Sequence, residues 1–367
     1  MASIDKRPNG KYRARWREAP GGPQKTRHFS RKADAERFLA GVQADLYRGD
    51  YVDPDAGKVT YFDYAERWRA AQVHRPTTAA QVETHLRRHV YPALGDKQLR
   101  DVRPTAVQSF VKGLEAKGLA PATVEVIYRY TSAVFTAAVA DGLLRQSPCR
   151  GVKLPKVEPA KVKPLAVDEV WRLVDEAPDR YRALVLTAAA TGLRQGEMFG
   201  LTVDRVDFLR RRLTVDRQLV LMPGGAPELA PPKTTASYRD VPLPDVALAA
   251  LSSHLATFGA GQDGLVFTND RGERIRRTRF SDVWRPMVKR AGLEGTVFHD
   301  LRHHYASLLI RHGESVKVVQ ARLGHASAAE TLDTYSHLWP DSEDRTRQAV
   351  DEFLGSAEDR LRTAVGG

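Results

Sequence analysis

Cysteine is almost absent from this chain of 367 residues, because Cys149 is the only one. A disulfide framework needs pairs of cysteines and a cysteine-based zinc site needs several, so the sequence excludes both. No run of about 18 apolar residues occurs, and the first residues, "MASIDKRPNGKYRARW", contain no apolar signal region. These absences argue against a membrane-spanning or secreted protein and predict a cytoplasmic, nucleoid-associated one.

Acidic residues are also in deficit, with 45 aspartates and glutamates against 57 lysines and arginines, a formal net charge of +12. Apolar residues still make up 42% of the chain, which is enough for two or three domains with cores of their own. The positive excess favours a polyanionic partner, and nucleic acid is the first candidate. A basic protein that is merely soluble is the plain alternative.

Positive charge is concentrated at the N-terminus, where residues 1–32 hold ten basic and two acidic side chains, a net charge of +8. The stretch "KYRARWR" alternates basic and apolar residues, which is typical of a half-buried strand, and Asn9-Gly10 before it signals a hairpin turn. We expect residues 1–57 to form a small β-sheet backed by one helix. Because a basic ribbon fits the major groove, this domain is predicted to bind DNA rather than to be a solvated hairpin. The candidate DNA-contacting residues are Lys11, Arg13, Arg15, Arg17, Lys25 and Arg27.

Residues 58–150 are predicted to form a helical bundle. Apolar residues recur there every three to four positions, as at Val107, Phe110, Val111 and Leu114, and such stripes form a core rather than a cofactor site. Prolines and lysines dominate the following segment, 151–164, which should therefore be an extended basic linker. A basic strap between two domains suits a chain that wraps around a duplex.

Residues 165–367 are predicted to form a mainly α-helical domain with a small antiparallel sheet, which makes the whole chain an α+β multidomain protein. The expected helices span 167–177, 180–191, 244–257, 277–291, 300–312, 315–323 and 327–337. The expected strands lie at 204–208, 212–220, 238–243 and 265–268.

Tyr335, in "LGHASAAETLDTYSHL" (323–338), raises the question of nucleophilic chemistry. Its phenol is a poor nucleophile at neutral pH because the ordinary pKa of tyrosine is about 10, so an attack would need nearby cations. Basic and imidazole side chains precede it in four motifs: "TGLRQGEMFGL", "PPKTTASYRDVPL", "HDLRHHYASLL" and "RLGHAS". The second motif is expected at a hairpin tip. Each motif is weak evidence by itself; together they supply Arg194, Lys233, His299, Arg302 and His325.

In this order, and with these flanking residues, the set resembles the catalytic domain of the tyrosine recombinases, the phage-integrase family. The resemblance covers 165–340; residues 58–150 resemble the core-binding domain of that family, and 1–57 resemble the arm-binding domain of integrases. It implies a site-specific DNA recombinase, the integrase of a temperate phage or integrative element. Its partners would be duplex attachment sites, three further copies in a homotetramer, a DNA-bending protein and a directionality factor. The rivals are a type IB topoisomerase and an inactive DNA-binding regulator.

The resemblance also implies roles for these residues. Arg194 and Arg302 would clamp the phosphate oxygens, because guanidiniums meet developing negative charge with paired hydrogen bonds. Lys233 would protonate the departing 5′ hydroxyl, and Tyr335 would hold the 3′ phosphate covalently. His299 and His325 could each donate hydrogen bonds or move protons, and the sequence leaves open which is the base. No cofactor is implied.

A metal site is the alternative interpretation of the histidines. His299 and His303 are four residues apart, as zinc ligands often are, and His304 and His337 could complete a set. The motif lacks the glutamate of metalloproteases, however, and the family resemblance explains it without a metal, so we predict none. Arg239 is predicted to contact DNA phosphate or to be structural, and Glu197 to be a structural partner of an arginine.

The C-terminal tail, 341–367, carries an apolar stripe that includes Phe353 and Leu354. A helix that folds back on its own domain is one expectation. The resemblance implies another, docking of the tail on a neighbouring protomer of the tetramer.

Overall fold

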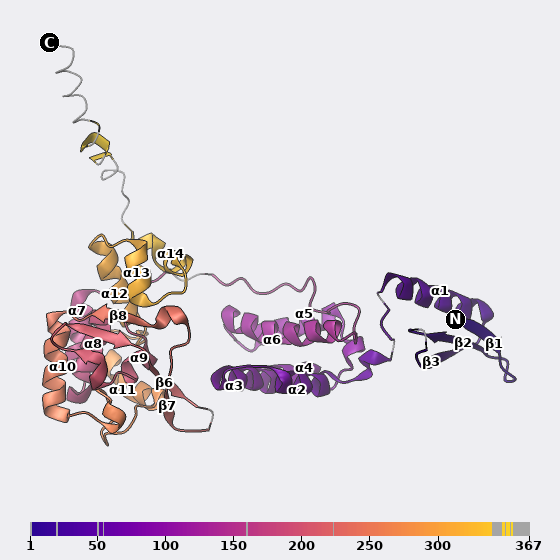
Figure 1. The fold of residues 1–367 in the computed structure, drawn as a ribbon, viewed down its shortest axis with the longest axis horizontal. Helices are drawn as coiled ribbons and strands as arrows, with labels where there is room; N and C mark the ends of the chain where they lie inside the picture. The colour runs from indigo at the N-terminus through magenta and orange to yellow at the C-terminus, as the bar shows by residue number, and fades with distance from the viewer. Residues whose placement is uncertain are drawn as a thin grey trace, which may run out of the picture. The chain divides into compact units, whose positions relative to one another are not determined.

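The computed structural model describes residues 2–19, 21–49, 51–53, 55–158, 161–222, 224–339, 347–348, 350–352 and 354. The chain divides into two compact units, Met1–Glu158 and Pro159–Gly367 (Figure 1). The boundary between them falls inside the segment expected to be a linker. The expectation for the C-terminal tail rests on residues such as Phe353 that lie outside the described ones.

The N-terminal sheet is antiparallel in the order β1 (Ser3–Lys6), β2 (Tyr12–Arg17), β3 (Gln24–Phe29), and helix α1 (Lys32–Arg48) follows it. The alternation in β2 directs Ala14 and Trp16 into a small core with Leu39 and Val42 of α1. The predicted sheet backed by one helix is confirmed.

The first unit continues as a helical bundle, also as predicted. Its helices are α2 (Tyr61–Ala71), α3 (Pro76–His85), α4 (Tyr91–Leu94), α5 (Pro104–Ala116) and α6 (Pro121–Ala140). A π-helical turn, η2 (Leu86–Val90), joins α3 to α4, and short 3₁₀ turns lie at η1 (Ala56–Lys58) and η3 (Leu99–Asp101). Prolines begin α3, α5 and α6, where their missing N–H groups cost nothing. The predicted stripe is buried, and Cys149 is buried beside it.

The second unit is mainly helical with two small antiparallel sheets, in the orders β4-β5-β8 and β6-β7. Its helices are α7 (Val167–Asp175), α8 (Asp179–Thr191), α9 (Gln195–Phe199), α10 (Asp245–Phe258), α11 (Arg277–Arg290), α12 (Asp300–Arg311), α13 (Val316–Leu323) and α14 (Ala328–Tyr335). Its strands are β4 (Val206–Asp207), β5 (Arg212–Val215), β6 (Gln218–Leu221), β7 (Pro227–Ala230) and β8 (Arg239–Pro242). Short 3₁₀ turns lie at η4 (Val203–Arg205), η5 (Thr235–Ser237), η6 (Gln262–Gly264) and η7 (Ser336–Leu338).

Two expected strands differ from the structure. The segment 212–220 forms two strands instead of one, because the extended strand ends before Asp216. The Asp216 side chain forms ion pairs with Arg205 and Arg217. The segment 265–268 makes only an isolated bridge, between Leu265 and Thr202. Helix α9 and strand β7 were not predicted, because elements of five and four residues are too short to show a periodicity.

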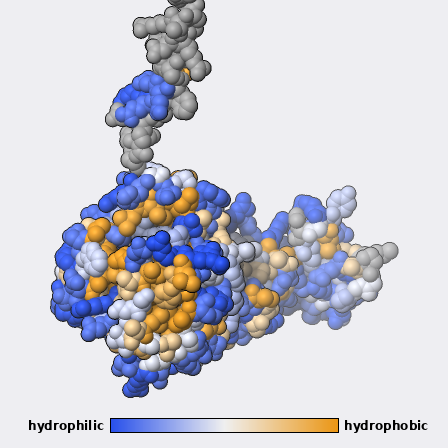
Figure 2. Space-filling view, turned by 60° about the vertical axis from the view of Figure 1, so that its left-hand side comes forward, coloured by the Kyte–Doolittle hydropathy of each residue, from blue (hydrophilic) through white to orange (hydrophobic). Residues whose placement is uncertain are grey.

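The surface of the second unit mixes apolar and charged areas (Figure 2). On the face shown in Figure 2, hydrophobic residues gather within a border of hydrophilic ones. Among the described residues, no helix is long and apolar enough to cross a membrane.

Candidate active site

Two arginines of the predicted set are held by backbone carbonyls at the C-terminal ends of helices. Arg302 of α12, only 2% exposed, donates from Nη1 to the carbonyl of Gly192 (2.9 Å) and from Nη2 to that of Leu323 (2.6 Å). Arg194 donates from Nη2 to the carbonyl of Gly324 (3.0 Å). The ends of α8 and α13 carry partial negative charge, so they are suited to hold cations.

Glycines make these helix ends possible. Gly192 ends α8 and Gly324 ends α13, both with a φ of 64°, in the left-handed region that favours glycine. A Cβ on Gly192 would lie 2.4 Å from Cδ1 of Tyr305, and one on Gly324 would lie 2.9 Å from the carbonyl of Ala236. The glycines of "TGLR" and "RLGH" are therefore part of the arginine clamp.

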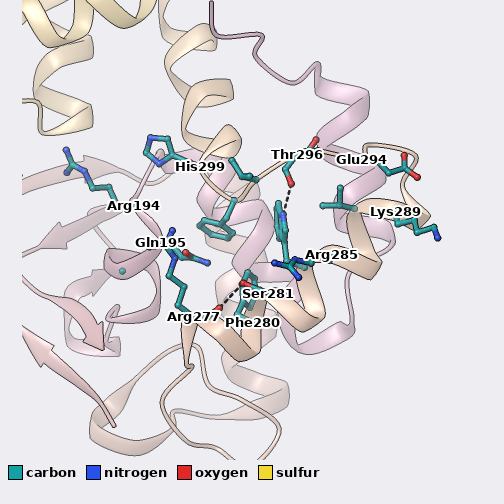
Figure 3. A pocket seen from close by; sticks show the side chains of 16 residues that line it. Arg194, Gln195, Arg277, Phe280, Ser281, Arg285, Lys289, Glu294, Thr296 and His299 are labelled. Carbon is teal, nitrogen blue, oxygen red and sulfur yellow. Dashed lines mark hydrogen bonds between the residues drawn. The ribbon is translucent and has the colours of Figure 1, made fainter. Parts of the chain in front are cut away.

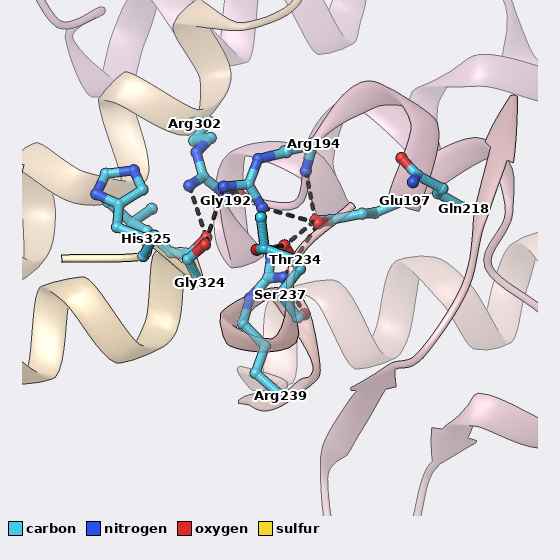
Figure 4. A network of polar contacts seen from close by, with 12 residues as sticks. Gly192, Arg194, Glu197, Gln218, Thr234, Ser237, Arg239, Arg302, Gly324 and His325 are labelled. Atoms are coloured by element: carbon cyan, nitrogen blue, oxygen red, sulfur yellow. Dashed lines mark hydrogen bonds and ion pairs between the residues drawn. The ribbon is translucent and has the colours of Figure 1, made fainter. Parts of the chain in front are cut away.

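Glu197 is the buried anion among the arginines (Figure 4). Its carboxylate, 3% exposed, accepts from the Arg194 backbone N–H (2.9 Å), Arg194 Nη1 (3.0 Å), and Arg239 Nη1 and Nη2 (3.1 and 2.8 Å). Burial alone would raise the pKa of Glu197, but the hydrogen bonds and charges of Arg239 and Arg194 outweigh it and hold that pKa below its usual range. This agrees with the structural role expected for Glu197.

Arg239 is committed to the same network. Its guanidinium, 5% exposed, also donates to the carbonyls of Arg322 (2.8 Å) and Ser237 (2.9 Å). Of the two roles that the sequence left open for it, DNA contact and structural support, this geometry favours the second. Two guanidiniums therefore pair with this one carboxylate, and Arg302 lies within the field of all three, which leaves an excess of positive charge.

The excess charge acts on Arg302. Desolvation by burial is the largest cause that lowers its pKa, to about 9, and the charges of Arg194 and Arg239 lower it further against the opposing effect of Glu197. An anion bound here would relieve this repulsion. The site is thus built to bind an anion such as a phosphate.

Tyr335 ends α14 and is 1% exposed. Desolvation by burial raises the pKa of its phenol to about 12, although the charges of Arg302 and Arg194 oppose that shift. Its Oη lies 2.8 Å from Nδ1 of His303, within hydrogen-bond distance. Tyr335 is therefore a neutral phenol at pH 7, placed beside an imidazole and in the field of the two clamp arginines.

His325 and His299 both lie near these charges. His325 is buried, with its ring stacked parallel to that of Tyr335 (centroids 6.4 Å apart) and Nδ1 within 2.8 Å of Thr331 Oγ1. Desolvation, followed by the charge of Arg302, lowers the pKa of His325 to about 3. Desolvation and the charge of His303 lower the pKa of His299, at the start of α12, to about 4. Both imidazoles are therefore neutral at pH 7 without bound DNA.

His303 is the residue that the sequence analysis undervalued. It was considered only as a metal ligand, whereas the structure places it against the Tyr335 hydroxyl. The sequence did contain a signal for this position, because "HDLRH" puts His303 one turn after His299. In the structure, the two rings meet edge to face with centroids 4.8 Å apart. What the sequence could not supply is the position of α14 across from α12.

Lys233 lies on an exposed segment between β7 and η5. It is not at a hairpin tip, because the β6-β7 hairpin turns earlier, between Leu221 and Pro227. The next residue, Thr234, bonds Ser237 (2.9 Å), whose carbonyl accepts from Arg239. The Lys233 segment is thus tied to the Glu197 network.

A pocket of about 780 Å³ opens beside Arg194 and His299 (Figure 3). Its floor contains Phe280, Trp284 and Phe298, whose rings pack with centroids 5.3–6.0 Å apart. Trp284 Nε1 also donates to the carbonyl of Thr296 (2.9 Å). This packing fixes the chain directly before His299. Basic side chains also line the pocket: Arg277, Arg285 and Lys289.

The two other histidines of the candidate metal set, His304 and His337, are tied to backbone carbonyls. His304 bonds the carbonyl of Leu165 (2.7 Å), and His337 bonds that of Val162 (2.9 Å). Among the described residues, no three His, Cys, Asp or Glu side chains are grouped in a way that could hold a metal ion.

The candidate DNA-binding residues of the N-terminal sheet are partly neutralised. Asp5 of β1 pairs with Arg13 (2.9 Å) and Arg15 (3.0 Å). Lys25 pairs with Glu18 and Asp53, which raise the pKa of Lys25 against the effect of desolvation. Arg27 is exposed but lies over the Phe38 ring, 5.1 Å from its centroid, and Lys11 and Arg17 are exposed as well. Of the six candidates, these three thus keep the most accessible charge.

Comparison with known proteins places this geometry in a family. Residues 163–341 match the phage integrase family, and residues 61–154 match the phage integrase central domain. A tyrosine recombinase XerC-like protein of Caldanaerobacter subterraneus is 26% identical over 352 residues, which cover 88% of this chain and 89% of that protein. The integrase of Mycobacterium phage FRAT1 is 27% identical over 309 residues, covering 80% of this chain and 91% of that one.

A solved structure has the same fold. The lambda integrase tetramer bound to a Holliday junction matches with a TM-score of 0.60 and 20% identity, covering 89% of this chain and 96% of that one. Together with the two family matches, which account for both the helical bundle and the unit that carries Tyr335, these findings show that the chain belongs to the phage integrase family of tyrosine recombinases.

Proposed function

We propose that Tyr335 is the nucleophile with which this site-specific recombinase cleaves and rejoins duplex DNA at attachment sites. When cleaved strands of two attachment sites are exchanged and rejoined, once for each pair of strands, a phage or integrative element would be integrated or excised. The observation that carries the proposal is the buried Tyr335 in the field of the Arg302 and Arg194 guanidiniums, of which Arg194 is held by Glu197. Such a site has the charge to hold a phosphodiester and a hydroxyl to attack it.

In this mechanism, attack of Tyr335 Oη on phosphorus forms a 3′-phosphotyrosyl bond and breaks the bond to the 5′ oxygen. Negative charge that develops on the phosphate oxygens is met by Arg194 and Arg302, which helix ends and Glu197 have already positioned. Lys233 protonates the departing 5′ oxygen, and His299 and His325 donate hydrogen bonds to the phosphate. The covalent bond keeps the energy of the cleaved linkage for rejoining.

The test uses a duplex that is nicked near the cleavage site. The short fragment that carries the new 5′ hydroxyl is lost after cleavage, so a covalent adduct accumulates. Its sequence is selected from random duplexes by their affinity for the chain, and the nick is moved along the selected site. A denaturing gel should show an adduct that protease removes. Bound sites without any adduct would favour a DNA-binding regulator.

Assembly as a homotetramer on paired sites is part of the proposal, and its support is the fold shared with the lambda integrase tetramer on a Holliday junction. The proposed DNA-bending protein and directionality factor would act on such a complex. Native gels with one and with two selected sites should separate single-site complexes from a four-subunit complex.

Cleavage is expected to continue in excess EDTA. The guanidiniums of Arg194 and Arg302 supply the positive charge that a metal ion supplies in other phosphoryl-transfer sites, so no cofactor enters the proposed reaction. Adduct yield with and without chelator is the measurement. Loss of cleavage in EDTA and its return with zinc or magnesium would contradict this prediction.

The N-terminal domain, residues 1–57, is proposed to bind arm-type DNA outside the cleavage site. Replacing exposed Lys11 and Arg17 with alanine should weaken binding to long duplexes, and the slope of log affinity against log salt should become shallower by about 1.8. Adduct formation on a short core site should be retained. The same charge removed from α1, by Lys32→Ala with Arg37→Ala, is the control; equal effects of both pairs would remove the proposed role from Lys11 and Arg17.

A further inference from the structure

We propose that His303 is the proton acceptor of Tyr335, a catalytic role additional to those of the other histidines. The inference rests on the proposed function of Tyr335 as nucleophile. Its central observation is the 2.8 Å distance between His303 Nδ1 and Tyr335 Oη. No other hydrogen bond to that hydroxyl is recorded among the described residues.

The neighbouring histidines are placed for other work. His325 Nδ1 lies 2.8 Å from Thr331 Oγ1, and its ring is stacked parallel to the Tyr335 ring rather than directed at the hydroxyl. His299 lines the pocket beside Arg194. Neither has a recorded hydrogen bond with Oη, so His303 alone holds a ring nitrogen where the proton must leave.

The surroundings of His303 keep it able to accept a proton. Desolvation is the main cause that lowers its pKa and Arg302 lowers it further, whereas Asp300 raises it. The other titratable groups that face it are His299 directly before α12, His325 on the turn before α14, and Tyr335 itself. At pH 7 the ring is therefore neutral, and with its proton on Nε2 it accepts from the phenol at Nδ1.

The proton balance of cleavage is then complete. As Oη forms its bond to phosphorus, the phenol proton passes to His303 Nδ1. The bond from phosphorus to the 5′ oxygen breaks, and that oxygen takes a proton from the general acid proposed above. In rejoining, the 5′ hydroxyl attacks, Tyr335 leaves, and His303 returns its proton to Oη.

The test is the pH dependence of single-turnover adduct formation on the nicked duplex with the selected sequence. In the wild-type chain, protonation of His303 removes the acceptor, so the rate should fall as the pH drops below its pKa and level off above it. His303→Asn keeps a polar atom near the Nδ1 position but cannot take a proton. Its rate at pH 7 should be lower by about 10²- to 10⁴-fold.

The shape of the profile separates a proton acceptor from a packing residue. Without His303 the phenol must ionise unaided, so the rate of His303→Asn should rise about tenfold for each pH unit between pH 7 and 9, because that range lies below the phenol pKa. A merely structural role would lower the rate and keep the wild-type profile. His312→Asn, an exposed histidine after the same helix, is the control and should match the wild type.

Two results would overturn the inference. One is a wild-type pH profile in His303→Asn. The other is faster cleavage by His303→Asn, which would make His303 a latch that restrains Tyr335. Failure of the proposed function is distinguishable from both, because it would show as no adduct in the wild-type chain or as an adduct that persists in Tyr335→Phe.

Discussion

Replacing Tyr335 with phenylalanine is expected to reduce covalent adduct formation to an undetectable level while DNA binding is retained. The substitution removes one oxygen and keeps the ring, which is 1% exposed and packs in a core with Tyr305, Ile310, Val319 and Leu323. Only the hydrogen bond with His303 is lost from the recorded contacts, at a cost of about 1 kcal/mol in folding free energy. The fold and the arginine clamp should therefore survive.

Two measurements check this expectation on the same nicked duplex. A native gel compares DNA affinity, and a denaturing gel compares adduct yield. Tyr305→Phe is the matched control, because it removes a hydroxyl from the same buried core without touching Tyr335 Oη. An adduct in Tyr335→Phe would remove Tyr335 from the mechanism, and equal loss of cleavage in both variants would point to packing instead of chemistry.

Much of the fold could be predicted because apolar periodicity is a local property. The stripe in α5 spans about two turns, and the alternation in β2 marks both its strand and its buried face. Short elements such as α9 could not be predicted for the same reason. Helix α9 forms because Glu197 caps it by accepting from the Arg194 N–H, and five residues carry no period of their own.

The candidate site was predictable in composition and not in arrangement. Motifs identified which side chains to consider, but the contacts that define the site join distant residues, such as Arg302 with Gly192 and Arg194 with Gly324, which are 110 and 130 positions apart. A single sequence cannot state which carbonyl an arginine will meet. It also could not show that Arg239 is committed to Glu197, or that His303 meets Tyr335.

Charge in the N-terminal domain shows the same limit. The alternation in "KYRARWR" places only basic residues on the outer face of the predicted strand, yet Asp5 of the neighbouring strand pairs with both Arg13 and Arg15. Partly exposed pairs of this kind contribute little to folding and still reduce the charge that is available to DNA. The accessible positive charge therefore depends on strand register, which counting does not reveal.

Glu197→Gln is the other substitution with a large expected effect. It removes the carboxylate from a buried group of arginines, and the amide presents N–H groups toward donors of Arg194 and Arg239. Removing one partner of a buried ion pair commonly destabilises a fold by about 3–5 kcal/mol, and we expect a loss of that order in urea denaturation. Cleavage should fall as well, because the amide has one acceptor oxygen instead of two and Arg194 loses one of the two hydrogen bonds that Glu197 accepts from it.

The dependence of stability on pH gives this prediction its sign. The pKa of Glu197 is lowered in the folded chain, so its stabilising contribution is complete above the ordinary glutamate pKa of 4.5 and is lost as the pH falls through the folded value. The difference in unfolding free energy between wild type and Glu197→Gln should therefore be constant above about pH 5 and shrink in acid. Glu169→Gln, which alters a half-exposed carboxylate that caps α7, should cost less than about 1 kcal/mol. If Glu197→Gln were as stable as Glu169→Gln and cleaved DNA at the wild-type rate, Glu197 would not be the group that holds the clamp together.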